Sequence, residues 1–233
     1  MVKVACCWDD GVVNDIRLIA LLRKYNAKAT FNLNPGTMPE HTAVPRWRKL
    51  DEEIWSYNGF INGKVGLAEM KEVYEDFQVA SHGWLHKGGS AGIWEFYKDA
   101  TDARKYLEDV FQRECRGYAW PCGDYTPRAG KILKDAGFLY GRTTQNTDKV
   151  GFTDAPMQLH PSCHHMDRLF CDKFHAAKEN NGIFYFWGHS YEMYEYDKLW
   201  ERYEYKLKYI SNDPDAEWAN VVDIAPLCGK KGV

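Results

Sequence analysis

Two adjacent carboxylates, Asp9 and Asp10, follow a short apolar segment near the start of the chain, and Gly11 comes directly after them. In such a pair, one carboxylate can bind a cation while the other stays free to take a proton from a water molecule. The same residues could instead cap a helix and form a turn, because Asp and Gly both favour those positions. The pair is therefore a candidate for chemistry that needs support from another part of the chain.

Two histidines with three residues between them, His82 and His86, follow a second apolar segment. If this segment turns helically, the two imidazoles project from the same side. A histidine pair can also be a surface feature or a hydrogen-bonded part of the core. The pair becomes a candidate metal site if a carboxylate such as Asp10 lies close to it, because two His and one carboxylate leave coordination positions open for water and substrate.

The elements that must position these residues alternate between short apolar stretches and amphipathic ones, a pattern typical of β-α units around a parallel sheet. The sequence predicts strands at residues 2–8, 29–33, 78–80, 117–120, 139–142, 157–159, 182–187 and 218–224. It predicts helices between Asn14 and Asn26 and at residues 67–74, 93–113, 127–136, 168–179 and 198–210. About seven or eight parallel strands interleaved with helices favour an irregular or incomplete (β/α) barrel over an open doubly wound sheet.

Length and composition fit this architecture. The 233 residues suit a single domain, 1–233, with one large core. Residues 35–66 break the β-α rhythm with several Pro and Gly, which predicts an inserted loop, a lid or a subunit contact. We find no nucleotide-binding glycine loop. Oligomeric state has no signal in the sequence.

The net charge and the targeting features of the sequence indicate which binding partners and which cellular location to expect. The formal net charge of -3 provides no basic field for nucleic acid or an anionic membrane. No apolar run approaches the ~20 residues that span a bilayer, and no secretory leader is visible, so we expect a cytoplasmic protein. The 7 Cys are irregularly spaced and contain no C-x-x-C pair, so we expect reduced thiols.

The motifs resemble those of the polysaccharide deacetylases, the NodB-homology or carbohydrate esterase family 4 proteins, over nearly the whole chain. The Asp-Asp pair and the His-x-x-x-His segment match the family's first two motifs in order and spacing. The segment 118–123, Tyr-Ala-Trp-Pro-Cys-Gly, is similar to the third motif, with Ala119 at the family's Arg position and Cys122 at an aromatic position. The apolar strand before His189 is similar to the fifth motif. The resemblance implies a NodB-like deformed TIM barrel.

The resemblance also implies a role for each matched residue. The catalytic base would be Asp9, the metal ligands Asp10, His82 and His86, and the general acid His189. The third motif would line the substrate groove with Trp120, Pro121 and Cys122. Trp84, Trp120 and Trp187 could stack on a sugar ring or simply pack in the core. Glu192 could orient His189 or bind substrate hydroxyls.

The loss of the third-motif arginine matters because that arginine supports the base in the family. Arg142, at the end of the next predicted strand, is the best substitute, so this chain would have exchanged the residue between neighbouring strands. The alternative is that Arg142 is an ordinary solvent-facing loop charge. A second cluster, His160, His164 and His165, could bind substrate or another metal, although a surface or core role is the simpler interpretation.

The implied activity is metal-dependent hydrolysis of an N-acetyl or related acyl group from an amino sugar or oligosaccharide by metal-activated water. The metal would be one divalent transition ion, with zinc as the first choice and cobalt, nickel, manganese or iron also compatible with the ligands. Three alternatives remain open: hydrolysis of small amides such as imides, ureides or formamides on the same fold, a catalytically inactive carbohydrate-binding relative, or an unrelated barrel enzyme.

Overall fold

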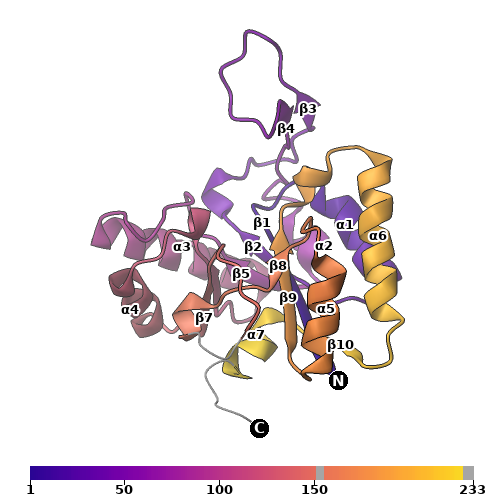
Figure 1. Cartoon of the computed structure of the whole chain (residues 1–233). Coiled ribbons are helices and arrows are strands. Elements are labelled where there is room, and N and C mark those ends of the chain that lie inside the picture. The colour runs from indigo at the N-terminus through magenta and orange to yellow at the C-terminus, as the bar shows by residue number, and fades with distance from the viewer. Residues whose placement is uncertain (151–154, 228–233) are drawn as a thin grey trace.

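The strands form one parallel eight-stranded sheet that curls around a core, with helices packed outside it (Figure 1). This computed structural model describes residues 1–150 and 155–227. The strands are β1 (Val2–Asp9), β2 (Thr30–Leu33), β5 (Gln78–Ser81), β6 (Gly117–Ala119), β7 (Tyr140–Arg142), β8 (Cys163–His164), β9 (Ile183–Gly188) and β10 (Ala216–Trp218). Their order is β7-β6-β5-β2-β1-β9-β8, and β10 pairs with β1 off this path. The predicted incomplete (β/α) barrel is confirmed.

The central strand β1 shows why this sequence builds such a sheet. It pairs in parallel with β9 on one side and with β10 and then β2 on the other. Val4, Cys6 and Trp8 belong to one core cluster, whereas Ala5 and Cys7 belong to another. Both faces of the strand are therefore covered, which explains its nearly continuous apolar sequence.

Helices cover the outer face of the sheet, with the exception of α7. The helices are α1 (Asp15–Lys24), α2 (Met70–Tyr74), α3 (Ile93–Phe111), α4 (Pro127–Asp135), α5 (Phe170–Glu179), α6 (Asp197–Ser211) and α7 (Val221–Ile224). Val221 and Ile224 of α7 share the second core cluster with Ala5 and Cys7, on the other face of β1. Residues from α1, α5 and α6 share the first core cluster with β1. No helix within residues 1–150 and 155–227 is long and apolar enough to cross a membrane. The six described cysteines are free, and Cys228 lies outside the described residues.

Two predicted strands are wrong. Residues 156–158 form a short 3-10 helix, η3 (Pro156–Gln158), because proline at a first helical position favours a turn, and only Leu159 makes a bridge to Arg142. Near the C-terminus, β10 ends at Trp218 and α7 follows. The side chains of Asn220 and Asp223 form a capping box there, which starts a helix despite the β-favouring valines.

The inserted segment carries a small antiparallel hairpin of β3 (Arg46–Trp47) and β4 (Phe60–Ile61). It projects beyond the carboxyl ends of the parallel strands, at the top of Figure 1. The segment after β4 is hydrogen-bonded to the first βα loop. Lys64 forms an isolated β-bridge with Val12, and Val65 N donates to Gly11 O at 3.0 Å. The insertion therefore lies at the end of the sheet where active sites of βα folds are found.

Candidate active site

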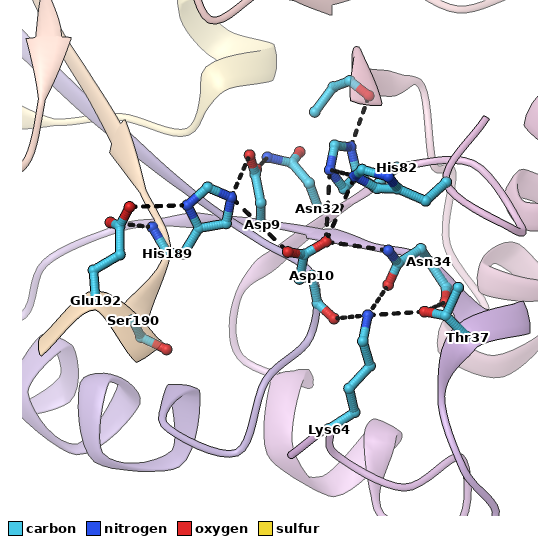
Figure 2. A network of polar contacts seen from close by, with 12 residues as sticks. Asp9, Asp10, Asn32, Asn34, Thr37, Lys64, His82, His189, Ser190 and Glu192 are labelled. Carbon is cyan, nitrogen blue, oxygen red and sulfur yellow. Dashed lines mark hydrogen bonds and ion pairs between the residues drawn. The ribbon is translucent and has the colours of Figure 1, made fainter. Parts of the chain in front are cut away.

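The carboxyl ends of four strands bring the candidate residues together. Figure 2 shows three of them, Asp9, His82 and His189. Asp9 ends β1 and Arg142 ends β7, while His82 directly follows β5 and His189 directly follows β9. Parallel strands place such positions at one edge of the sheet. Residues separated by up to 180 positions thus share one site.

Asp10, His82 and His86 form a group that could hold a metal ion, with one ligand atom from each within 4.8 Å of the others. Each histidine Nε2 lies 3.8 Å from Asp10 Oδ1. His82 Nδ1 lies 2.9 Å from Ala119 O, so this nitrogen donates and leaves the Nε2 lone pair directed at the group. Burial lowers the pKa of His82 to about 4, which keeps it neutral as a metal ligand must be. The donor set and its tautomer fit a divalent transition metal.

The two imidazoles meet through an irregular loop and not through a helical turn. Gly83 has φ 76° and His86 has φ 60°, both in the left-handed region. The Asp99 carboxylate accepts bonds from the backbone N-H of Trp84 at 3.0 Å and of Leu85 at 2.7 Å. A Cβ at Gly83 would lie 2.2 Å from Asp99 Oδ2, so glycine permits this buried anchor.

Asp10 is held in place by residues that sequence reasoning missed. Asn34 Nδ2 donates to Asp10 Oδ1 at 3.2 Å, and Lys64 Nζ donates to Asp10 O at 3.0 Å (Figure 2). Lys64 also donates to Asn34 Oδ1 at 2.9 Å and to Thr37 Oγ1 at 2.8 Å. Asn34 directly follows β2, which was an available signal, whereas Lys64 comes from the insertion and carried none.

Arg142 reaches Asp9 from β7, although β6, β5 and β2 lie between β7 and β1 in the sheet order. Its Nη2 donates to both carboxylate oxygens of Asp9, and Asn32 Nδ2 donates to Oδ1 at 2.7 Å. Burial alone would raise the pKa of Asp9, but the charges of Arg142, His82 and His189 outweigh burial and lower it. Asp9 is therefore held ionised and oriented.

His189 lies opposite the two aspartates. Its Nε2 is 3.9 Å from Asp9 Oδ2 and 3.9 Å from Asp10 Oδ2, while its Nδ1 is 3.3 Å from Glu192 Oε1. Burial would lower the pKa of His189, but the contact with Glu192 and the charges of Asp9 and Asp10 raise it to about 9. The side chain is therefore a proton donor at neutral pH.

Glu192 gathers several imidazoles around one carboxylate. The Nε2 atoms of His164 and His165 both lie 2.9 Å from its Oε2, which also accepts the His189 backbone N-H at 3.0 Å. His164, His189 and Glu192 form a second group with metal-ligand spacing. Met166 N donates to His164 Nδ1 at 3.2 Å, so the His164 proton lies on Nε2 and is shared with Glu192. Glu192 thus orients His189, one of the two roles that the sequence suggested for it.

The residues that were predicted to line the substrate groove differ in how buried they are. Trp120 is fully buried, stacks on Phe96 at 5.6 Å and donates its Nε1-H to Met157 O at 2.9 Å, so this ring packs in the core and faces no substrate. Pro121 is buried too, whereas Cys122 is exposed with φ 54°.

Trp84 packs edge-on against Tyr106 at 5.4 Å. His160 Nδ1 lies 2.5 Å from Thr143 Oγ1.

Comparison with known proteins agrees with this geometry. The family model for polysaccharide deacetylases matches residues 2–141, more than half of the chain. The chain belongs to the polysaccharide deacetylase family. The matched range includes Asp9, Asp10, His82 and His86, and His189 lies beyond it. The comparison with curated proteins found no match.

Solved structures of family members share the fold. A polysaccharide deacetylase described as putative from Mycobacterium smegmatis is 14% identical, with a TM-score of 0.62 over 97% of this chain and 90% of that one. A family 4 acetyl xylan esterase from Clostridium thermocellum, solved with a cobalt ion, is 14% identical, with a TM-score of 0.57 over 97% and 91%. A family 4 pseudoenzyme from Bacillus anthracis is 13% identical, with a TM-score of 0.55 over 96% of this chain and 65% of its own. Another match, a Streptococcus pyogenes deacetylase, is covered over 55% of its length, with a TM-score of 0.47 and 20% identity over 60% of this chain. Active and inactive proteins thus share this fold, so function must be argued from the site.

Proposed function

We propose that this protein is a divalent-metal-dependent hydrolase that removes an N-acetyl or related acyl group from an amino sugar. One observation supports the proposal: Asp10, His82 and His86, which have the ligand set of a hydrolytic metal site, lie next to a buried ionised carboxylate, Asp9, and a protonated imidazole, His189. A binding protein has no use for a base and an acid beside one metal group.

Asp10, His82 and His86 would hold the metal, and zinc suits this ligand set best among the common candidates. When bound, such an ion polarises an acyl carbonyl and makes water more acidic. The His82 tautomer fixed by Ala119 O and the Asp10 loop fixed by Lys64 keep the ligand atoms in place without the ion.

The chain's own residues would move the protons. Asp9 is ionised at any physiological pH and accepts a proton on the oxygen that faces His189. His189 holds a proton on Nε2 and donates it to the departing nitrogen, after which Glu192 keeps the ring in position. Arg142 stays protonated throughout because its charge is paired with Asp9 in the buried site.

Metal content is the first test. Elemental analysis of the native chain should find about one divalent transition metal in the proposed site, lost in Asp10→Ala and in His82→Ala but retained in His175→Ala, a control in an exposed contact with Tyr209. Screening acetylated amino sugars beside small amides, with Asp9→Asn as the inactive control, then tests the reaction. A native chain that binds no metal even after reconstitution would contradict the proposal.

A further inference from the structure

A cavity outside the sheet lies between the loop after β8 and the helices α5 and α6, which pack side by side through Phe174 and Tyr209 (Figure 1). Its volume of about 380 Å³ is in the range of small-molecule sites. We call it the α5–α6 pocket. Three cationic and three apolar side chains of its wall matter here: Arg168, Arg202, Lys206, Met166, Met193 and Leu199.

The three cations of the pocket are not neutralised by the protein. Within residues 1–150 and 155–227, none of Arg168, Arg202 and Lys206 forms an ion pair with an Asp or Glu side chain. The nearby carboxylate of Asp167 lies 3.6 Å from the Nζ of another residue, Lys173. Three unpaired positive charges around one cavity favour an anionic ligand.

Lys206 is held in the wall of the pocket. Its Nζ donates to His165 O at 2.5 Å and lies 4.4 Å from the centre of the Phe170 ring. Burial lowers the pKa of Lys206, the charge of Arg202 lowers it further, and the carboxylate of Asp167 offsets this only in part. A ligand carboxylate in the pocket would relieve the repulsion between the two cations and strengthen the charge on Lys206.

The other side of the wall is apolar. Met193 is buried, Leu199 is half-buried and Met166 is exposed, so apolar surface extends from the core to the solvent. Methionine side chains are flexible and adapt to ligands of different shapes. A ligand that matches the whole pocket therefore has a negatively charged end and an apolar body.

His165 stands between the pocket and the candidate active site. Its ring is buried and lines the pocket, and its Nε2 lies 2.9 Å from Glu192 Oε2. Met193 directly follows Glu192 in the 3-10 helix η4 (Ser190–Met193). Among the described residues that line the pocket, none is a proposed metal ligand, base or acid. The pocket is thus a neighbour of the candidate active site and not a part of it.

We propose that the α5–α6 pocket binds a small organic carboxylate with an apolar body. The carboxylate lies among Arg168, Arg202 and Lys206, and the apolar body packs on Met193 and Leu199. The inference does not rest on the proposed function, because no residue of the metal group takes part. A neutral sugar would leave the three charges unmatched and is disfavoured as the occupant.

The test compares two probes of the same shape, 4-phenylbutyrate and the neutral 4-phenylbutan-1-ol, by calorimetry on the native metal-loaded chain. We expect saturable binding of one carboxylate and about 10-fold weaker binding of the alcohol, which lacks the charge-assisted contacts. Arg168→Gln and Arg202→Gln, both at exposed positions, should each weaken 4-phenylbutyrate about 10-fold for the same reason. Arg128→Gln, at an exposed position of α4, is the matched control and should bind like the native chain.

A variant of the metal group locates the bound probe. Native affinity for 4-phenylbutyrate in His86→Ala would support the pocket, whereas lost binding would assign the carboxylate to the metal and overturn it. The absence of saturable binding to the native chain, equal affinity for the two probes, or native affinity in both arginine variants would also overturn it. A chain that binds the probe through Arg202 but takes up no metal would support the pocket and contradict the proposed hydrolase.

Discussion

Arg142 contacts both carboxylate oxygens of Asp9, and the two side chains are only 1% and 3% exposed. Arg142 is the register partner of Ala119 in the parallel pair of β6 and β7. Ala119 stands where the family's third motif has arginine, and neighbouring strands lie about 4.8 Å apart. A guanidinium moved one strand sideways at the same level thus still reaches the carboxylate that ends β1.

Removing this guanidinium should cost turnover more than metal binding. We expect Arg142→Ala to lower kcat by about 100-fold or more, because Asp9 would become a buried carboxylate without its partner, with a raised pKa and a free rotamer. Steady-state kinetics and metal content measured on the same sample check this. Arg142→Lys should recover part of the rate, and Arg116→Ala, which removes a half-buried arginine near Glu114, serves as the control. Native turnover in Arg142→Ala would show that the ion pair only stabilises the fold.

The contact between the insertion and Asp10 should matter for metal affinity. Lys64 fixes both the Asp10 backbone and Asn34, so we expect Lys64→Met to weaken metal binding by about 10- to 100-fold, as for other residues that orient ligands. Competition with a chromophoric chelator measures the affinity. Lys49→Met, an exposed lysine of the same insertion, should have native affinity. Equal affinities in the two variants would show that the Asp10 loop holds its shape without Lys64.

The sequence was most informative where function and local pattern coincide. Asp9, Asp10, His82, His86 and His189 follow apolar segments, so the topology of a parallel sheet alone places them at one edge. The contact of Arg142 with Asp9 was also predictable, because the predicted strand after the third motif offered a single arginine at its end.

Features that depend on tertiary packing were not predictable. A helical turn was one way to bring His82 and His86 together, but the segment is a loop whose backbone N-H groups donate to the buried Asp99 carboxylate. Trp120 looked like a groove residue, yet its ring fills the core beside Phe96. Lys64 carried no signal, because nothing local in a Pro- and Gly-rich insertion says which residue folds back onto the first loop.

The carboxylate of Glu192 should control proton donation without affecting the metal. Glu192→Gln keeps the shape but weakens the contacts to His165 and His189, so we expect kcat to fall about 10- to 100-fold with native metal content. Kinetics combined with elemental analysis check this. Glu195→Gln, an exposed neighbour, should behave like the native chain. If Glu192→Gln instead loses one of two bound metal ions, the group of His164, His189 and Glu192 is itself a metal site.

Asp15 gives the fold a pH dependence that can be measured apart from catalysis. Burial raises the pKa of Asp15 from 3.8 to about 7, despite hydrogen bonds from Ser190 at 2.6 Å and Tyr74 at 2.8 Å. Below pH ~4 the carboxyl is protonated in the folded and unfolded chains alike, so it has no effect there. Between pH ~4 and ~7 the unfolded chain releases the proton while the folded chain keeps it, so stability falls as pH rises, by up to about 4 kcal/mol.

Asp15→Asn removes this titration and should therefore gain stability relative to the native chain as pH rises. We expect urea unfolding at pH 4, 6 and 8 to show a free-energy difference between variant and native chain that shifts in favour of the variant and levels off above pH ~7. Asp51→Asn, on the exposed insertion, should show no such trend. A constant difference for Asp15→Asn across this range would mean that the carboxyl is already ionised in the folded chain, with Ser190 and Tyr74 as sufficient donors.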